Sequence, residues 1–323
     1  MTNKKLYLCL TDSCNLACKG CYKPCTLQQI SFLDINRIKE VISDMLKGLA
    51  KDDSLECVFH GGEPFYLIKD TKPYIELIDT FPNVIWSATT NLMYDLTEDH
   101  INLFNKFTNK FIKTSWDVDD YRFKTKDQLN LWEINIRKLI KLGFNIQVIV
   151  TVNNQTVLHK PKELLTYFKA LGIHIVNFER ITETGRAAEV KVKPTNREID
   201  DWLYEVFIVN KEFQLEIPLF EELIHYKQDF FGCRRRECMQ NVRTLNTDGS
   251  LGACPNCSDK IIKTKDNIYN KNLEDTLIKI EKSIPNPCKF CKFYKICNGD
   301  CCQLQFDETG CPGLTKIYEE ILR

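Results

Sequence analysis

The stretch KLYLCLTDSCNLACKGCY, residues 5–22, decides how the rest of the chain is interpreted. It opens with an apolar run that predicts a buried β-strand over residues 5–11, and it continues directly into a short loop with three cysteines. Cys14, Cys18 and Cys21 are separated by three and by two residues, so one compact loop can present three thiolates to one metal centre. In a 4Fe-4S cluster this would leave one iron without a protein ligand, which is the open position that a catalytic metal site needs.

Outward from this loop, the first two thirds of the chain alternate β-type runs with amphipathic helical patterns, which is typical of βα units around a parallel sheet. Six strands are predicted, at residues 5–11, 55–60, 84–90, 111–116, 146–152 and 173–178. Helices are predicted between them, at residues 34–49, 70–80, 97–107, 127–142 and 161–171, with Gly143 and Gly172 as C-terminal caps. Thr195 opens a further helix with a capping box. We expect an α/β fold with a partial (β/α)6 TIM-like barrel, in which chemistry collects at the C-terminal strand ends.

Composition narrows the function classes. The 323 residues carry 44 basic and 44 acidic side chains, so nothing in the overall charge indicates nucleic acid or an anionic membrane as a partner. The apolar stretch at the N-terminus is too short for a secretion signal, and no run approaches the length of a membrane span. We therefore expect a cytoplasmic protein that acts on neither nucleic acid nor membrane.

The content of sixteen cysteines is the most unusual feature of the composition. In a reducing cytosol, so many cysteines are favoured as metal ligands over disulfides. Six lie before residue 60, none lies between Cys57 and Cys233, and ten lie between Cys233 and Cys311. This distribution predicts a catalytic domain over residues 1–215 and a small cysteine-rich domain over residues 216–323, which ends in a helix. Within the second domain, residues 273–283 are predicted to form another short helix.

The first cysteine loop resembles the signature of the radical S-adenosylmethionine (SAM) superfamily, in which three cysteines at this spacing are followed by an aromatic residue, here Tyr22. The segment Gly61-Gly62-Glu63-Pro64, at the end of the second predicted strand, is similar to the family's Gly-Gly-Glu-Pro segment. The resemblance implies that this segment binds the amino group of SAM through backbone carbonyls. On the residues alone, a zinc knuckle completed by Cys25 and a plain glycine turn stay open as alternatives.

Further residues at later strand ends are candidates for SAM binding. Ser115 and Asp117 flank a tryptophan with the alternation that points both to one side, and the resemblance implies that they hold ribose hydroxyls. Asn91 occupies the place of a recurrent Thr-Asn-Gly turn, although Leu92 replaces the glycine. Arg186 is a candidate for the methionine carboxylate, and pairing with neighbouring side chains is its alternative.

The second cysteine region matches, gap by gap, the C-terminal motif of the SPASM subfamily, which is named for maturases of peptides and proteins. Ten residues separate Cys238 from Gly249, four more lead to Cys254, and later gaps of two, five and three residues follow Cys288. The resemblance implies two auxiliary 4Fe-4S clusters and three clusters in all. The first auxiliary cluster would take Cys233, Cys238, Cys254 and Cys301, and the second would take Cys288, Cys291, Cys297 and Cys311.

Several cysteines leave choices open. Two structural zinc sites are the rival interpretation of the second region, because four-thiolate sites make similar demands. Cys233 is the least secure ligand, since some relatives leave the first auxiliary cluster open to substrate. Cys257 and Cys302 lie near expected ligands and are candidates for a hydrogen donor or a substrate contact. Cys9 and Cys57 lie within predicted strands and are interpreted as small buried hydrophobes.

The resemblance implies reductive cleavage of SAM to a 5′-deoxyadenosyl radical, with the auxiliary clusters accepting an electron or binding substrate. We expect a maturase that forms a thioether or carbon–carbon crosslink in a ribosomally made peptide or protein, or oxidises a side chain. A flavodoxin- or ferredoxin-type protein would supply electrons. Only thirteen residues precede Cys14, which leaves little room for a recognition domain, so a separate protein could bind any leader peptide.

Two further functions stay open. Relatives that oxidise a sulfatase side chain carry an aspartate after the cysteine equivalent to Cys254, and Pro255 at that position argues against the same activity here. A radical SAM dehydrogenase or rearrangement enzyme acting on a small alcohol or sugar is the second enzymatic hypothesis. A non-catalytic iron–sulfur electron carrier is the least favoured hypothesis, because such a protein would have no use for the Gly-Gly-Glu-Pro segment.

Overall fold

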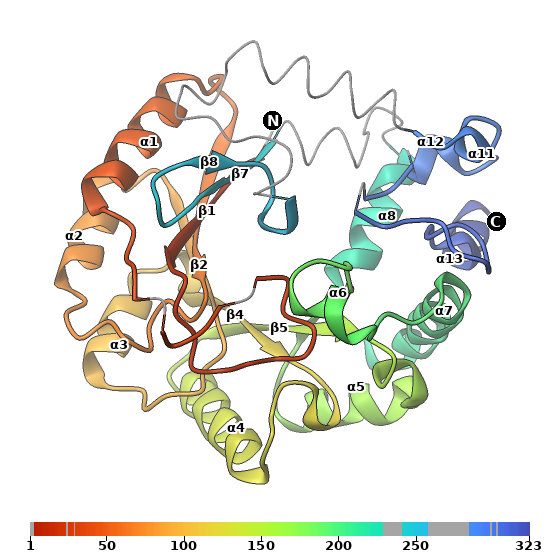
Figure 1. Cartoon of the computed structure of the whole chain (residues 1–323), viewed down its shortest axis with the longest axis horizontal. Coiled ribbons are helices and arrows are strands. Elements are labelled where there is room, and N and C mark those ends of the chain that lie inside the picture. The colour runs from red at the N-terminus through yellow and green to blue at the C-terminus, as the bar shows by residue number, and fades with distance from the viewer. Residues whose placement is uncertain are drawn as a thin grey trace.

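One sheet forms the framework of the computed structural model, which describes residues 3–23, 25–28, 30–228, 241–257, 284–297, 299–301 and 303–323. Its strand order is β6-β5-β4-β3-β2-β1-β7-β8, and the curved sheet leaves an open barrel (Figure 1). The six predicted strands are confirmed and all run parallel. They are β1 (Asn3–Thr11), β2 (Ser54–Gly61), β3 (Ile85–Thr90), β4 (Phe111–Trp116), β5 (Asn145–Val152) and β6 (Ile175–Arg180).

The crossover helices cover the outer face of the sheet, as their amphipathic patterns predict. They are α1 (Ile35–Lys47), α2 (Lys72–Thr80), α3 (Glu98–Phe104), α4 (Lys126–Lys141) and α5 (Pro161–Ala170). Gly143 and Gly172 have φ of +79° and +82°, so both predicted left-handed caps are confirmed. The capping box at Thr195 also forms and opens α7 (Asn196–Phe213).

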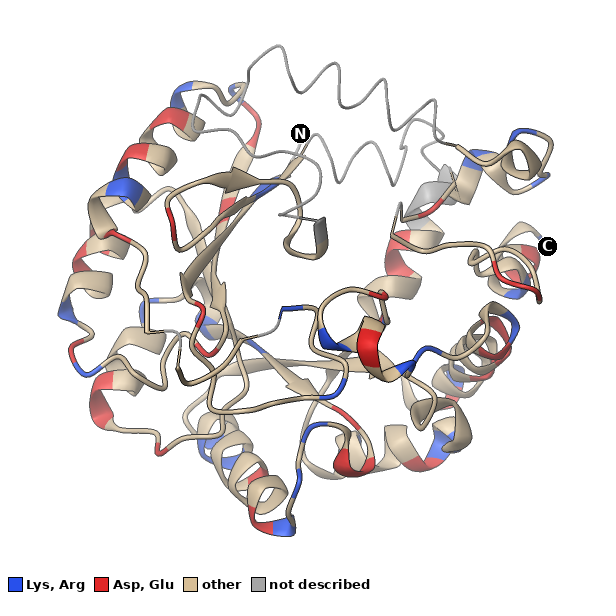
Figure 2. Cartoon of the chain, in the orientation of Figure 1, with Lys and Arg blue, Asp and Glu red and all other residues tan. Residues whose placement is uncertain are grey.

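Shorter elements connect this framework. They are the helices α6 (Arg186–Val190) and α8 (Pro218–Gln228), and the 3-10 turns η1 (Thr108–Lys110), η2 (Asp119–Tyr121), η3 (Thr156–Leu158) and η4 (Pro255–Cys257). Figure 2 shows acidic and basic residues mixed along the outer helices, such as α1, α4 and α7. No helix among the described residues is both long and apolar enough to cross a membrane.

The sheet extends past β1 into the cysteine-rich part of the chain, which the sequence did not predict. The strand β7 (Val242–Leu245) pairs in parallel with β1, and the short β8 (Leu251–Gly252) turns back antiparallel to β7. At the opposite edge, Glu216 forms a parallel bridge to Ile175 of β6. Residues on both sides of the predicted boundary at 215 and 216 thus contribute to the same sheet.

The C-terminal segment packs beside the last helices of the barrel. Its helices are α11 (Asn286–Lys289), α12 (Tyr294–Cys297) and α13 (Thr315–Leu322), and α13 lies next to α7 and α8. Asn196 at the start of α7 donates from its side chain to the carbonyls of Gln305 and Gly310 at 2.9 Å each. The predicted helix at 273–283 lies outside the described residues.

The two faces of the barrel strands differ in chemistry. Along β1, Leu6, Leu8 and Leu10 are fully buried against the helices, so alternation turns Lys5 and Tyr7 towards the barrel interior. Glu56 of β2 lies beside Lys5 in the strand register, and their side chains form an ion pair of 3.0 Å. The interior is therefore polar, while the hydrophobic core lies between sheet and helices.

Candidate functional site

The cysteine loop leaves the C-terminal end of β1 and lies against the end of β2. The backbone N–H of Gly62 donates to the Thr11 carbonyl at 2.7 Å, and that of Glu63 donates to the Ser13 carbonyl at 2.8 Å. A Cβ on Gly62 would lie 2.1 Å from the Ser13 carbonyl oxygen, and one on Gly61, at φ +135°, would lie 2.4 Å from the Thr11 oxygen. Only glycines allow this approach, so the Gly-Gly segment serves first to seat the cysteine loop.

The segment after β6 holds the same loop from another side. Arg186 donates from its backbone N–H to the Cys21 carbonyl at 3.0 Å, and its guanidinium donates to the carbonyls of Cys18 at 3.1 Å and Cys25 at 3.2 Å. A Cβ on Gly185 would lie 2.4 Å from the Tyr22 carbonyl oxygen. Arg186 is thus part of the site, and its backbone N–H and guanidinium both donate to the backbone of the loop.

The ends of β3 and β4 complete the attachment. The Asn15 side chain accepts from Asn91 Nδ2 at 2.8 Å and donates to the Met93 carbonyl at 2.7 Å. The Lys19 backbone N–H donates to the Tyr121 carbonyl at 3.1 Å. Four different strand ends therefore fix one loop across the C-terminal mouth of the barrel, where parallel barrels place their chemistry.

The three thiols of the loop lie in a partly buried, donor-rich environment. Burial raises the pKa of Cys14 to about 12 and also raises the pKa of Cys18. Donors face both sulfurs, because the Leu16 N–H reaches Cys14 Sγ at 3.4 Å and Arg122 Nη1 reaches Cys18 Sγ at 3.4 Å. The Cys21 thiol donates to the Lys23 carbonyl at 2.5 Å, a proton that metal binding would displace.

These residues fit an iron–sulfur cluster better than a single ion. No group of three histidine, cysteine or acidic side chains in the described part of the chain converges on one ion position. A cluster makes no such demand, because each thiolate binds a different iron. The buried hydroxyl of Tyr121 has no hydrogen-bond partner among the residues that the structure describes, and it lies against Gly20, between two of the cysteines. An inorganic sulfide is an acceptor that would suit such a group.

Glu63 joins β2 to the turn after β3. Its carboxylate accepts from the Thr90 hydroxyl at 2.7 Å and from the Asn91 backbone N–H at 2.5 Å. Burial raises its pKa to about 7 against the effect of these donors. Leu92 has φ +54°, so the predicted turn forms although leucine stands where the recurrent motif has glycine. Pro64 is buried beside this contact.

Asp117 lies beyond the end of β4 and is engaged with other residues of the chain. Its carboxylate accepts from Arg122 Nε at 2.7 Å and from the Thr151 backbone N–H at 3.0 Å. Arg122 thereby bridges Asp117 and Cys18, which makes it a site residue that the sequence did not reveal. Ser115 lies two residues earlier on β4 and is half-buried, so the alternation that groups it with Asp117 is compatible with the structure.

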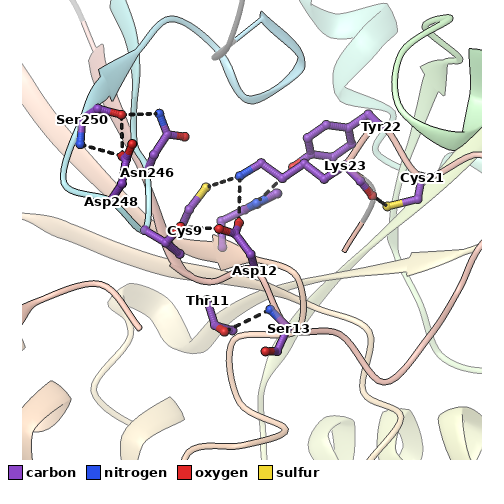
Figure 3. Close-up of polar contacts among 12 residues, drawn as sticks. Cys9, Thr11, Asp12, Ser13, Cys21, Tyr22, Lys23, Asn246, Asp248 and Ser250 are labelled. Atoms are coloured by element: carbon purple, nitrogen blue, oxygen red, sulfur yellow. Dashed lines mark hydrogen bonds and ion pairs between the residues drawn. The ribbon is translucent and has the colours of Figure 1, made fainter. Parts of the chain in front are cut away.

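A polar cluster lies beside the cysteine loop on the inner side of β1 and β2. Tyr22 Oη is 3.3 Å from His60 Nδ1, and burial, with Lys23 and Lys113 nearby, lowers the pKa of His60 to about 3. Figure 3 shows Lys23 reaching towards Cys9 and Asp12, with distances of 3.2 Å to Cys9 Sγ and 3.6 Å to Asp12 Oδ1. Cys9 is fully buried as predicted, yet it faces an ammonium rather than a purely apolar core.

Comparisons with known proteins agree with this geometry. A family described as "4Fe-4S single cluster domain" matches residues 5–131. A cysteine-type anaerobic sulfatase-maturating enzyme of Clostridium novyi is 23% identical over 90% of this chain and 85% of that protein. The GTP 3',8-cyclase of Vibrio cholerae is 26% identical over 87% of each. The chain is similar to these proteins, which supports its resemblance to the radical S-adenosylmethionine superfamily.

Solved structures share its fold, a partial barrel followed by a SPASM domain. The structure titled "Native anSMEcpe with bound AdoMet and Cp18Cys peptide" has a TM-score of 0.74 at 16% identity and covers 100% of this chain and 96% of that one. Streptococcus suis SuiB bound to precursor peptide SuiA has a TM-score of 0.67 at 14% identity, with 93% and 72% covered. At these identities the likeness shows the fold.

In the SPASM part, Cys297 and Cys311, two expected ligands of the second auxiliary cluster, lie close to each other. A Cβ on Gly313 would lie 3.2 Å from Cys311 Sγ and 3.4 Å from Cys297 Sγ, so both sulfurs flank this glycine. Burial raises the pKa of Cys311. The hydrogen bond from the Gly313 N–H partly lowers this pKa again, and the nearby Cys288 and Cys291 raise it. The structure therefore places Cys297 and Cys311 side by side, and the ligand set itself stays a prediction.

The expected first auxiliary set is only partly described. Cys254 and Cys301 are half-buried, whereas Cys233 and Cys238 lie outside the described residues. Of the two candidate hydrogen donors, Cys302 also lies outside them. Cys257 ends the turn η4, and its side chain is outside the described part. Their assignments stay predictions.

Proposed function

We propose that this chain is a radical SAM maturase that modifies a ribosomally made peptide or protein by a thioether or carbon–carbon crosslink, or by side-chain oxidation. The observation that carries the proposal is the loop of Cys14, Cys18 and Cys21, which four strand ends fix across the C-terminal mouth of the barrel. The peptide substrate is supported by two structural relatives whose titles name bound peptides.

The three loop thiols would hold the first 4Fe-4S cluster, and Tyr22, Gly61, Gly62, Glu63, Pro64, Asn91, Ser115, Asp117 and Arg186 would surround SAM. When bound, this pair of cofactors supplies reductive cleavage of SAM to methionine and a 5′-deoxyadenosyl radical. The chain's own residues hold the loop still, shield it and neutralise charge. Arg122 places a guanidinium 3.4 Å from Cys18 Sγ, and a cation at this distance favours a thiolate.

Two auxiliary clusters in the SPASM part belong to the same proposal, with the ligand sets given above and with Cys257 and Cys302 as candidate substrate contacts. Electrons would come from a flavodoxin- or ferredoxin-type protein, and a separate protein could present a leader peptide. The proximity of Cys297 and Cys311 supports the second auxiliary site.

Isotope transfer tests the peptide assignment. The reconstituted, reduced protein is incubated with SAM and a deuterated candidate peptide, encoded by a short gene beside its own, and both products are analysed by mass spectrometry. We expect deuterium in 5′-deoxyadenosine and a loss of hydrogen mass from the peptide. If SAM is cleaved but neither product carries the change with any neighbouring peptide, the peptide assignment fails.

A small-molecule substrate is the second candidate, and one observation favours it. The relative named GTP 3',8-cyclase, whose name specifies a nucleotide substrate, matches this chain at 26% identity over 87% of its length. In this alternative the same cysteine loop would act on an alcohol or sugar. Label transfer from a small metabolite, in the absence of peptide, would support it.

A further inference from the structure

A buried ion pair joins the barrel to the SPASM part. The Arg180 guanidinium, at the end of β6, donates from Nη1 to Asp300 Oδ2 and from Nη2 to Asp300 Oδ1, each at 2.7 Å. Nη1 also donates to the Pro312 carbonyl at 2.8 Å. The Arg180 side chain is 8% exposed and that of Asp300 is 3% exposed, so the pair is shielded from water. This is a bidentate ion pair, which fixes the orientation of the two side chains relative to each other.

Asp300 lies between expected ligands of both auxiliary clusters. Its backbone N–H donates to the Cys297 carbonyl at 2.9 Å, and its Oδ1 accepts from the Cys301 backbone N–H at 2.7 Å. Asp300 has φ +53°, a left-handed conformation that aspartate adopts with the help of a local side-chain hydrogen bond, here the one from the Cys301 N–H. Pro312 follows Cys311, so Arg180 also contacts the segment that carries a third expected ligand.

We propose that Arg180 and Asp300 form a positioning pair that holds the SPASM cysteines against β6 and balances the charge around the auxiliary clusters. This rests on the proposed function, in which those cysteines bind 4Fe-4S clusters. The pair lies beside both clusters' expected ligands, because Asp300 forms hydrogen bonds with the backbone of Cys297 and of Cys301. Net charge near a cluster is one of the quantities that set its reduction potential.

A charge-balancing role predicts two shifts of opposite sign. Reduction adds negative charge to a cluster, so a nearby cation favours the reduced state and a nearby anion disfavours it. Asp300→Asn removes the anion and leaves Arg180, which should make the auxiliary potential more positive. Arg180→Gln leaves the buried Asp300 without its cation, which should make the potential more negative. The double variant should return towards the wild-type value.

The experiment uses the full chain with Cys14, Cys18 and Cys21 changed to alanine, so that the spectroscopic signal comes from the auxiliary clusters alone. Each variant is reconstituted and titrated with a reductant while its paramagnetic resonance spectrum is recorded. Iron content and circular dichroism report whether it folded. Lys211→Met is the matched control, because its pair with Glu320 also joins the barrel to the C-terminal helix but is exposed, at 56% and 26%. This control should not shift the potential.

Opposite shifts with clusters retained, and a return in the double variant, are the expected result. Shifts of the same sign in both single variants, or none, would overturn the charge-balancing role although the clusters are present. If Arg180→Gln does not fold, the Asp300→Asn variant alone tests the proposal. A more positive auxiliary potential supports the charge-balancing role, and an unchanged or more negative potential overturns it. If the parent protein with intact SPASM cysteines binds no auxiliary cluster, the proposed cluster assignment itself fails, and this inference fails with it.

Discussion

The carboxylate of Glu56, inside the barrel, makes the stability of the protein depend on pH. Burial alone would raise the pKa of Glu56, but Lys113 and Lys5, each 3.0 Å away, outweigh it and lower the pKa to about 2. The folded carboxylate stays ionised below the ordinary pKa, so its stabilisation is complete above about pH 4.5 and is lost as the pH falls towards 2. At neutral pH this stabilisation is worth about 3 kcal/mol.

Glu56→Gln should therefore lower the free energy of unfolding at pH 7 by about 3 kcal/mol, and the deficit should shrink as the pH falls towards 3. Chemical unfolding of the metal-free protein at several pH values measures this. Asp120→Asn is the control, because its ion pair with Lys19 is exposed and should contribute nothing measurable. A deficit that does not depend on pH would contradict the electrostatic account.

Gly62 tests whether the glycine segment seats the cysteine loop. In Gly62→Ala the new Cβ would lie 2.1 Å from the Ser13 carbonyl oxygen, which is backbone and must move. We expect loss of iron from the first cluster, loss of SAM cleavage, and a fall in stability of about 1–3 kcal/mol. Gly143→Ala should keep its iron, because its Cβ meets nothing within 4 Å and only the positive φ costs about 1 kcal/mol. Equal iron content in both variants would refute this role for Gly62.

The residues that sequence reasoning missed share a physical cause. Arg122 and Cys18 are 104 positions apart and Arg180 and Asp300 are 120 apart, so no local spacing connects them. The cysteines and Gly61-Gly62 were predictable because each motif is local and its chemistry needs that spacing. Long-range partners are set by the fold.

At the element scale, the N-terminus of α13 is capped from a distance. Asp200 of α7 accepts from the Thr315 hydroxyl at 2.6 Å and lies 3.4 Å from the Lys316 backbone N–H, while the helix has no side-chain cap of its own. Asp200→Ala should weaken this docking by about 1–2 kcal/mol. Hydrogen exchange should rise in residues 315–322.

Asp201→Ala is the matched control for that change. Asp201 pairs with the Lys316 side chain, but both are 49% exposed, so its removal should leave exchange in α13 almost unchanged. Faster exchange in the Asp201 variant than in the Asp200 variant would contradict the capping role of Asp200.

The elements themselves were predictable wherever periodicity is strong. The six barrel strands and five crossover helices follow from alternation and three- to four-residue spacing, and their ends differ from the structure by a few residues. The strand β7 (Val242–Leu245) was not predicted, because four residues are too few to show an alternating pattern among turns and cysteines. The backbone of β7 is held in strand conformation by its pairing with β1, not by a pattern in its own sequence.

At the scale of the whole molecule, the chain arranges its barrel around one loop. Residues after β2, β3, β4 and β6 bind the loop that follows β1, so the site forms only when these strand ends have come together. The sequence predicted that the three thiols lie at the C-terminal end of the barrel, and the structure places their loop there. It could not show that Arg186 binds the loop backbone, because that contact spans 168 positions.

Cleavage of SAM tests the central claim most directly. The reconstituted, reduced wild type, Cys18→Ala and Cys25→Ala are each incubated with SAM, and 5′-deoxyadenosine is quantified. Cys25 is the matched control, because it is a buried thiol of the same loop and would be the fourth ligand of a zinc knuckle. We predict product from the wild type and from Cys25→Ala, and none from Cys18→Ala although its auxiliary clusters stay loaded. Absence of product from a wild type with intact clusters, or loss of activity in both variants alike, would contradict the account.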